Sequence, residues 1–291
     1  MTGDPELEAL RPHLLRLAYS QLGSLDEAED VVQEAWLRLQ RSDRAAIVDL
    51  RGWLTTVVGR LALDALRSAR VRREQYVGPW LPDPLVEAPS LEPDPADRVT
   101  LEESVSHALL VVLESLSPAE RTAFVLHDVF GYRFDEVAAV VGRTPVSARR
   151  LASRARRHVI ERRPRYPASR EDQRRVVEAF MAAVGEGDVA GLLAVLDPDV
   201  VMRSDGGGRV RAARKPVQGA ERVGRVVLGL ARKGMAGAEV EFVDVNGAPG
   251  VLVREASGTI SVGAFTVDGG RITAIDVVRN PDKLGHVRPP R

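Results

Sequence analysis

The sequence contains no cysteine among its 291 residues, and it contains only five histidines. Without cysteine the chain can form neither disulfides nor thiolate-based catalytic and metal sites. The histidines are scattered and none stand at an HxxxH spacing, so a structural zinc site is not expected either. We therefore predict no metal and no cofactor.

Long apolar runs are also lacking. No run approaches the ~18 residues that a membrane-spanning helix needs. The first 30 residues lack the basic and apolar regions of a secretory signal. We expect a soluble, cytoplasmic protein that makes no membrane contact.

Lysine is scarce, since it supplies only three of the 41 basic residues, and this bias towards arginine is typical of a GC-rich genome. Acidic residues also number 41, which gives a formal net charge of zero. The charge is unevenly distributed: residues 1–100 hold 12 Arg and 17 acidic residues, a net of −5, whereas residues 142–165 hold nine Arg and one Glu, a net of +8. A local basic stretch of this kind predicts contact with nucleic acid.

Periodicity and composition divide the chain into several domains. Apolar residues recur at spacings of three and four through most of the first 162 residues, which predicts helices. One stretch, "YVGPWLPDPLVEAPSLEPDPADR", breaks this pattern with six prolines and is typical of a linker. The predicted segments are a helical domain at 1–75, a Pro-rich linker at 76–98, a second helical domain at 99–163, a short linker at 164–170 and a third domain at 171–291.

The third domain begins with helices and ends with strands. Helices are predicted over 173–184, then, after a Gly-Glu-Gly-Asp break, up to 196, and near 220–233. The segments that follow alternate apolar and polar residues and stop at Gly or Asn, which predicts antiparallel strands and an α+β layer fold. Their apolar faces predict an apolar pocket with few catalytic groups. The residues expected to line it are Val240, Phe242, Val251, Val253, Ile260, Val262 and Phe265.

A helix-turn-helix pattern stands out in the second helical domain. Ser117–Glu120 forms a capping box with proline at the first helical position. The helices that follow stop at Gly131 and at Gly142, and a strongly basic helix comes next. Two helices joined by a short Gly-containing turn, the second one basic, predict a DNA-binding helix-turn-helix.

The basic helix of this motif begins with Thr144 as its N-cap. Val146, Leu151, Ala155 and Val159 fall roughly on one face, which we expect to be buried, and the arginines lie outside it. A merely solvated helix is the alternative, but such a helix usually carries compensating Glu at i±4, and this one does not. The arginines could neutralise phosphates or reach guanine edges, and the sequence leaves these two roles open.

The two helical domains together resemble bacterial RNA polymerase sigma factors. The segments "DEAEDVVQEAWLRL" and "LRGWLTTVVGRLALDALRSARVRR" resemble conserved region 2, and residues 101–160 resemble region 4. Because only a linker separates them, the chain resembles the extracytoplasmic-function (ECF) branch of the sigma-70 superfamily. The resemblance implies a factor that recruits core RNA polymerase to promoter DNA through the β′ clamp helices and the β flap, and that is not itself an enzyme.

The resemblance also implies roles for individual residues in the first domain. Contacts with core polymerase are expected from Asp30, Gln33, Glu34 and Arg38, with Val31 and Trp36 in the core. Contacts with the −10 promoter element are expected from Arg51, Trp53, Thr56, Arg60 and Arg67. Trp53 could instead be a core residue, and Gly59-Arg60 departs from the Arg-Asn of many family members.

In the second domain the resemblance assigns the basic helix to the −35 element. The residues expected to contact it are Arg143, Thr144, Ser147, Arg149, Arg150, Ser153, Arg154 and Arg157.

The third domain resembles the SnoaL-like branch of the NTF2-like α+β cone fold, in which helices pack on a curved antiparallel sheet. Three motifs, "YVGPWLPDP" at Tyr76–Pro84, "DGGG" at Asp205–Gly208 and "NPDKL" at Asn280–Leu284, identify one sigma-factor subgroup. The resemblance implies that this domain regulates the sigma factor in cis through contact with the sigma domains or the linker. The expected regulatory contacts are Tyr76, Trp80, Asp205, Gly206, Gly207, Gly208, Asn280, Pro281, Asp282, Lys283 and Leu284.

The "SDGGGR" stretch lacks the spacing of a nucleotide-binding loop, because it contains no GxGxxG and no Gly-Lys-Ser/Thr. Its glycines instead permit positive φ and close approach of another segment, and Asp205 could cap the turn or pair with an Arg. In "NPDKL" we expect an Asx-Pro turn that exposes Asp282 and Lys283 and offers Leu284 as an apolar plug.

Other functions stay open for this domain. An NTF2-like enzyme would need an acid/base such as Asp205 or Asp276, and a sensor would bind a small molecule in the cone pocket. A repressor that acts without polymerase is disfavoured by the predicted docking helix. The sequence does not say whether the domain activates or inhibits.

Overall fold

The computed structural model describes residues 5–87, 105–162, 166, 168–234 and 237–287. The chain divides into two compact units. Unit 1 comprises residues 1–75 and 109–163, and unit 2 comprises residues 76–108 and 164–291. The described part of the predicted linker therefore belongs to the same unit as the carboxy-terminal domain, and the remainder, with the predicted helical residues 99–104, lies outside the described residues.

The first half of unit 1 is a helical bundle. Its elements are α1 (Pro5–Leu22), α2 (Leu25–Gln40), the short η1 (Arg44–Ala46) and α3 (Leu50–Glu74). The three long helices bury one apolar stripe each, with Leu17, Val32 and Leu54 almost fully excluded from solvent. Among the described helices, none is long and apolar enough to cross a membrane.

The second half contains the predicted helix-turn-helix. Its elements are α5 (His107–Leu113), α6 (Pro118–Phe124), the π-helical turn η2 (Val125–Val129), α7 (Phe134–Val141) and α8 (Pro145–Arg162). The capping box is confirmed, because the Ser117 hydroxyl accepts from the Glu120 N–H and the Glu120 carboxylate accepts from the Ser117 N–H. Gly142 ends α7 in the left-handed conformation, at φ 64°.

The buried stripe of α8 differs from the predicted one. Four residues spaced by four, three and four positions face the core: Ala148, Ala152, Ala155 and Val159. Val146 was expected on this face, but it is 64% exposed. The small alanines let α8 approach its neighbours closely, so the contact stripe runs through them rather than through the larger apolar residues.

Helices α3 and α7 pack closely at Gly59. A Cβ atom at this position would lie 2.9 Å from a methyl group of Val140, so only glycine fits without a shift. The guanidinium of Arg60 donates two hydrogen bonds, at 2.9 and 3.2 Å, to the carbonyl of Ala139 near the end of α7. This contact explains both residues of the Gly59-Arg60 pair that departs from the family pattern.

Unit 2 is an α+β domain built on one seven-stranded sheet, which confirms the predicted fold class. The strand order is β1-β4-β5-β6-β7-β2-β3, and the β2–β7 pair is parallel while the others are antiparallel. The strands are β1 (Val86–Glu87), β2 (Leu196–Asp205), β3 (Val217–Gln218), β4 (Glu239–Val245), β5 (Ala248–Arg254), β6 (Ile260–Asp268) and β7 (Arg271–Val278).

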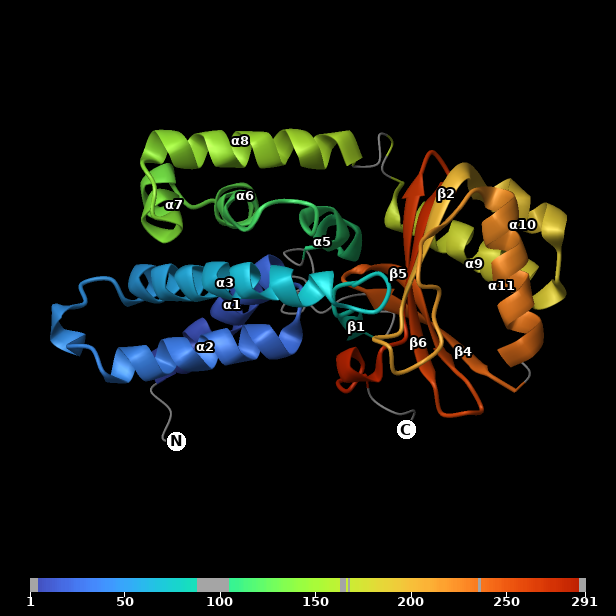
Figure 1. Ribbon diagram of the computed structural model, residues 1–291, viewed down its shortest axis with the longest axis horizontal. Coiled ribbons are helices and arrows are strands. Elements are labelled where there is room, and N and C mark those ends of the chain that lie inside the picture. Colours follow the sequence, from blue (N-terminus) through green and yellow to red (C-terminus); the bar gives the residue numbers. More distant parts are fainter. Residues whose placement is uncertain (1–4, 88–104, 163–165, 167, 235–236, 288–291) are drawn as a thin grey trace. The chain divides into compact units, whose positions relative to one another are not determined.

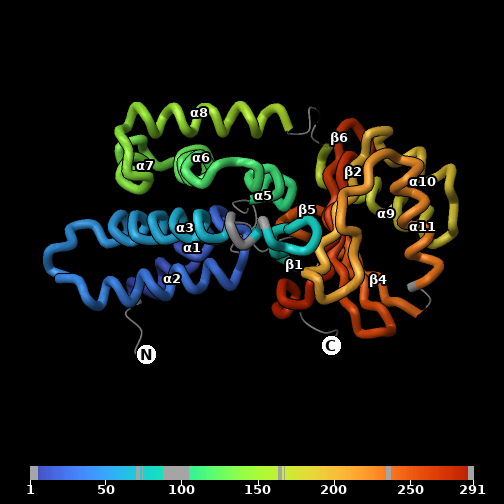
Figure 2. The backbone as a smooth tube through the Cα atoms, viewed as in Figure 1, coloured from blue at the N-terminus to red at the C-terminus, as the bar shows by residue number. Residues whose placement is uncertain are grey.

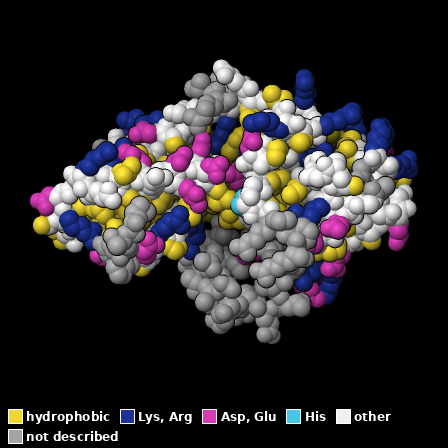
Figure 3. Space-filling view, turned by 90° about the horizontal axis from the view of Figure 1, so that it is seen from below, with side chains coloured by type: hydrophobic (Ala, Val, Ile, Leu, Met, Phe, Trp, Pro, Cys, Tyr) yellow, Lys and Arg dark blue, Asp and Glu magenta, His cyan; other side chains and the backbone are white. Residues whose placement is uncertain are grey.

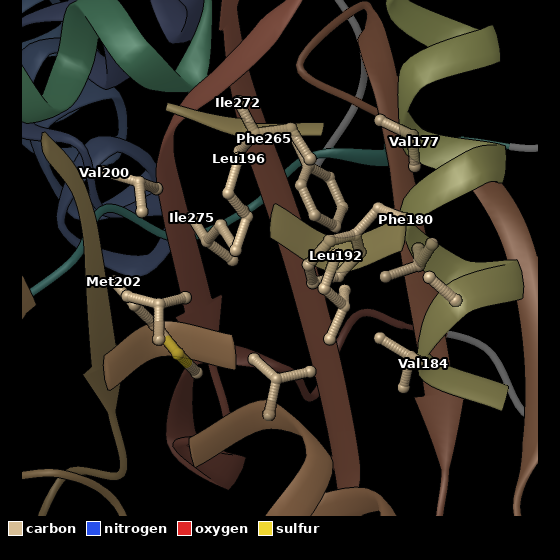
Figure 4. Packing of buried hydrophobic residues seen from close by; sticks show 14 of the residues in the cluster. Val177, Phe180, Val184, Leu192, Leu196, Val200, Met202, Phe265, Ile272 and Ile275 are labelled. Atoms are coloured by element: carbon tan, nitrogen blue, oxygen red, sulfur yellow. The ribbon is translucent and has the colours of Figure 1, made fainter. Parts of the chain in front are cut away.

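Three helices cover one face of this sheet: α9 (Arg170–Glu186), α10 (Val189–Val195) and α11 (Ala220–Gly234) (Figure 1). Between helices and sheet lies an apolar core in which the rings of Phe180 and Phe265 meet edge to face at 5.5 Å (Figure 4). The expected apolar lining is only partly correct, because Val240 and Phe242 are 38% and 41% exposed near the start of β4.

The opposite face of the sheet is covered by the linker and the chain end. Side chains alternate along a strand, so Met202 and Ile275 point into the helical core while their neighbours Arg203 and Asp276 point to the other face. At the edge of the sheet, β1 of the linker pairs with β4, and the backbone of Asn246 donates to the carbonyl of Leu85 at 2.8 Å. The linker and the turn η3 (Pro281–Lys283) thus complete the fold of unit 2 (Figure 2).

On the face shown in Figure 3, charged side chains of both signs are interspersed.

The close packing at Gly59 leads to a stability prediction. Replacing Gly59 with alanine should lower the free energy of unfolding of the full chain by about 1–3 kcal/mol, because the new Cβ overpacks against Val140. Chemical denaturation followed by circular dichroism measures the change. The matched control is Gly229→Ala in α11, where a Cβ meets no atom within 4 Å and the better helix former should stabilise the chain. Equal stabilisation by both variants would contradict the prediction.

Candidate nucleic-acid interface and linker clasp

The carboxylate of Asp205 binds three segments of unit 2: the linker, the loop that follows β2 and the turn near the chain end. It lies at the end of β2 and is fully buried. It accepts hydrogen bonds from the Tyr76 hydroxyl at 2.6 Å, from the Leu81 N–H at 2.9 Å and from the Gly207 N–H at 3.0 Å. The ammonium group of Lys283 completes the set at 2.9 Å. A buried carboxylate needs such partners, because burial without them costs several kcal/mol.

Lys283 binds the linker from the other side. Its ammonium group donates to the carbonyl of Leu81 and lies over the ring of Trp80, 3.9 Å from the centroid, and 5.5 Å from that of Tyr76. Both aromatic faces attract the cation. We call the set of Tyr76, Trp80, Leu81, Asp205, Asn280 and Lys283 the linker clasp.

The expected exposure of Lys283 was wrong. Only 9% of its surface is accessible, since its long stem and charged head are enclosed by the linker. Leu284 is buried, as expected of an apolar plug. Asp282 is exposed and pairs at 3.2 Å with Arg209, so it lies outside the clasp.

The glycines of "DGGG" allow the chain end to approach. Gly207 and Gly208 have φ values of 61° and 73°. A Cβ on Gly207 would lie 2.4 Å from the Asn280 amide, and one on Gly206 would lie 2.4 Å from the carbonyl of Val210. The Asn280 amide in turn donates to the Tyr76 hydroxyl at 3.0 Å. The loop is therefore a backbone device of the kind expected, with Asp205 paired to a lysine rather than to an arginine.

A second buried polar cluster contacts the linker at Pro82. Arg203 donates to both carboxylate oxygens of Asp276, at 2.6 and 3.2 Å. The His107 ring lies 4.0 Å from Asp276 and 3.4 Å from the carbonyl of Pro82. Burial is the main reason that the pKa of His107 lies below its ordinary value, with the nearby cations Arg203 and Lys283 adding to the effect and Asp276 opposing it.

Tyr76 also has a perturbed pKa. Burial raises the pKa of its hydroxyl first, and the hydrogen bond to the Asp205 carboxylate raises it further. The phenol therefore stays protonated and serves as a donor within the clasp. The sequence prediction missed three further residues that anchor the linker, because nothing in their local pattern marks them: Leu81, His107 and Asn246.

The arginines in and just before α8, apart from Arg162 at its end, fall into two groups. In the first, Arg149 stacks over Phe134 at 5.1 Å, Arg154 pairs with Glu120 at 3.0 Å, and the nearby Arg156 pairs with Asp128 at 2.5 Å. These pairs join α8 to the neighbouring elements of the helix-turn-helix. The second group is exposed and has no ionic partner within the part of the chain that the structure describes: Arg143, Arg150 and Arg157.

The remaining residues predicted for the −35 element lie near the start of α8 or on its outer side. Thr144 caps the helix, because its hydroxyl accepts from the Ser147 N–H at 3.3 Å and donates to the Ser147 hydroxyl at 3.1 Å. Ser147 is half-buried and Ser153 is exposed.

The residues predicted for the −10 element lie on α3, and two of them have partners. Arg60 is bonded to α7 as described, and Arg67 pairs with Asp64 at 2.8 Å. These two arginines line a cavity of about 320 Å³ together with Arg143. Arg51 is exposed, Trp53 is half-buried, and the Thr56 hydroxyl donates to the carbonyl of Gly52.

The predicted polymerase-docking residues lie on α2. Asp30 and Gln33 are exposed, and Glu34 pairs with Arg38 at 3.0 Å. Val31 is buried and Trp36 half-buried, as expected for core residues. The helix thus presents a polar outer face over an apolar inner one.

Known proteins are similar to this chain over almost its full length. The family models of Sigma-70 region 2, Sigma-70 region 4 and the SnoaL-like domain match residues 7–72, 106–159 and 177–283. The ECF RNA polymerase sigma factor SigJ of Mycobacterium tuberculosis is 42% identical over 96% of this chain and 92% of its own length. The chain belongs to the ECF RNA polymerase sigma factors.

Two further similarities span almost all of this sigma factor. The probable ECF RNA polymerase sigma factor SigI of Mycobacterium tuberculosis is 40% identical over 98% of this chain and 97% of its own. The crystal structure of SigJ superimposes with a TM-score of 0.79 at 38% identity, and it covers 97% of this chain and 98% of that one. The similarity to these relatives therefore extends over both sigma regions and the SnoaL-like domain of this chain.

The interior of the SnoaL-like domain is occupied by its own side chains. Val177, Phe180, Leu192 and Phe265 fill the space between helices and sheet (Figure 4). A cavity of about 90 Å³ lies between α9 and β4–β5, beside Phe242. Pockets for organic ligands are roughly 300–1,000 Å³, so this cavity is too small for such a ligand.

The buried His107 leads to a pH prediction. In the unfolded chain this residue binds a proton as the pH falls through 6.5, whereas the folded chain takes it up only at lower pH. Stability should therefore be greatest above that pH and fall as the solution is acidified through it. Melting temperatures at about pH 7.5 and about pH 5.5 test this. A His107→Gln variant should show a smaller loss on acidification, and an identical loss in both proteins would contradict the assignment.

Proposed function

We propose that unit 1 places core polymerase on promoters through three helices. Helix α8 reads the −35 element, α3 contacts the −10 element, and α2 docks on the polymerase β′ clamp helices. The observation that carries this proposal is the outer side of α8, where Arg150 and Arg157 are exposed and uncompensated. We keep the predicted domain boundaries, 1–75 and 99–163, for these two functions, and we assign the action to the cytoplasm, where core polymerase works.

We further propose that the SnoaL-like domain inhibits the sigma factor by holding its linker. The linker connects the region that contacts the −10 element to the region that contacts the −35 element. The clasp fixes it at Tyr76–Leu81, and His107, at the start of region 4, contacts it again at Pro82. A linker that is bound at several points adopts fewer conformations than a free one. Sigma regions 2 and 4 can then adopt fewer separations and orientations relative to each other. Release of the clasp removes this restriction.

A regulatory role fits the carboxylates of this domain better than a catalytic one. Asp205 and Asp276, the candidate acid/base residues, are both buried and each is paired with a cation. Both lie on the face that the linker covers. A general acid or base has to reach a substrate, and these groups are already engaged.

Transcription with purified core polymerase tests the inhibitory clasp. Replacing Lys283 alone would leave Asp205 buried without its cation, which costs about 3–5 kcal/mol. The informative variant is therefore Asp205→Asn with Lys283→Met, which removes both charges. We expect a several-fold rise in promoter-specific transcript and faster proteolysis within 76–87.

The matched control for the clasp is Asp282→Asn, because Asp282 neighbours Lys283 but its ion pair is exposed. This variant should transcribe like the parent chain. If the double variant keeps its circular dichroism spectrum and its output is unchanged or lower, the clasp does not inhibit. If the parent and the double variant both give no promoter-specific transcript, the sigma activity itself is refuted.

Salt dependence tests the phosphate contacts of α8. Arg157→Ala should lower the slope of log affinity against log salt by about one unit, because one phosphate contact is lost. Filter binding of promoter DNA by the holoenzyme over a salt series measures the slope. Arg156→Ala is the adjacent control, since this side chain pairs with Asp128 and should change the slope by less than half as much. Equal changes in both variants would count against a specific role for Arg157.

A further inference from the structure

One side chain on the outer ridge of α8 is not explained by packing. Val146 lies in the first turn and is 64% exposed. It starts a line of residues at spacings of four, three and four positions, which places them on one side of a helix. We call this line the outer ridge: Val146, Arg150, Ser153 and Arg157. It lies opposite the buried stripe that begins at Ala148.

The polar groups at the start of α8 are already engaged. The Thr144 hydroxyl donates to the Ser147 hydroxyl and accepts from the Ser147 N–H. Val146 is therefore the side chain that the first turn of α8 presents on the outer ridge. A solvent-exposed β-branched side chain adds nothing to the core here, and it favours the helix less than alanine would.

We propose that Val146 recognises the 5-methyl group of a thymine in the −35 element. In a helix-turn-helix, residues near the start of the second helix contact base edges in the major groove. Thymine is the base that carries a methyl group at that edge, and apolar side chains contact it. The exposed cations Arg143 and Arg150, one on each side of Val146, are suited to the phosphates and guanine edges around such a contact. The inference rests on the proposed role of α8 in reading promoter DNA.

Deoxyuridine, which lacks only the methyl group, provides the test. Holoenzyme containing the full chain is used to select the tightest duplexes from a library with a randomised −35 region. Each thymine of the selected element is then replaced singly by deoxyuridine, and affinities are measured for the parent and for Val146→Ala. At one thymine the parent should lose about fourfold in affinity, the effect of withdrawing one methyl group from an apolar contact. The Val146→Ala variant should lose less than twofold there.

Ile160→Ala is the matched control, because Ile160 is 63% exposed on the same helix near its other end. This variant should discriminate between thymine and deoxyuridine as the parent does. If the parent tolerates deoxyuridine at every position, or if Val146→Ala discriminates like the parent, the inference is wrong.

Failure of the underlying function is distinguishable from failure of this inference. Joint replacement of Arg150 and Arg157 by alanine should weaken binding to all duplexes, with or without the methyl group. Unchanged affinity in that variant would refute the role of α8 in DNA binding, whereas a loss of affinity without methyl dependence in the parent would refute only the thymine contact.

Discussion

The burial of one carboxylate, that of Asp205, determines how unit 2 is assembled. A carboxylate that is removed from water has to recover its hydration energy from donors in fixed positions. Its own loop supplies only the N–H of Gly207; the linker supplies Tyr76 and Leu81, and the chain end supplies Lys283. The strand that ends in Asp205 therefore requires both segments, and residues some 200 positions apart, such as Leu81 and Lys283, meet around it.

The linker is consequently a structural part of the SnoaL-like domain. Helices cover one face of the sheet, and the linker and chain end cover the other, where Arg203 and Asp276 lie. Removing the linker would expose this polar cluster and leave the ammonium of Lys283 without its aromatic partners. Any signal that frees the linker must therefore replace these contacts with others. The proposed inhibition and the folding of this domain would therefore be coupled, so that a partner that binds the freed linker or the uncovered sheet face would shift both.

Features that depend on neighbouring residues could be predicted from the sequence, and features that depend on distant ones could not. The capping box at Ser117–Glu120 and the helix end at Gly142 are local, and both are confirmed. The burial of Lys283 was missed because its partners are far away in the sequence. The burial of Val146 was wrongly predicted because large apolar residues are expected to face the core, whereas α8 packs mainly through alanines. The role of Gly59 depends on a helix from the other sigma region, which no local pattern reveals.

The arginine-rich composition of the chain illustrates why partners are more informative than residue types. A genome that favours arginine places guanidinium groups wherever a cation is tolerated, so their number alone does not identify a DNA-binding surface. In α8 the structure separates them: Arg149, Arg154 and Arg156 join the helix to its neighbours, whereas Arg150 and Arg157 extend from the outer ridge. The first group holds the helix in place, and the carboxylates paired with Arg154 and Arg156 offset their positive charge. The second retains the charge that attracts a phosphate backbone. Because it lies on the same ridge as Val146, one face of α8 combines exposed cations with the apolar side chain for which we propose a base contact.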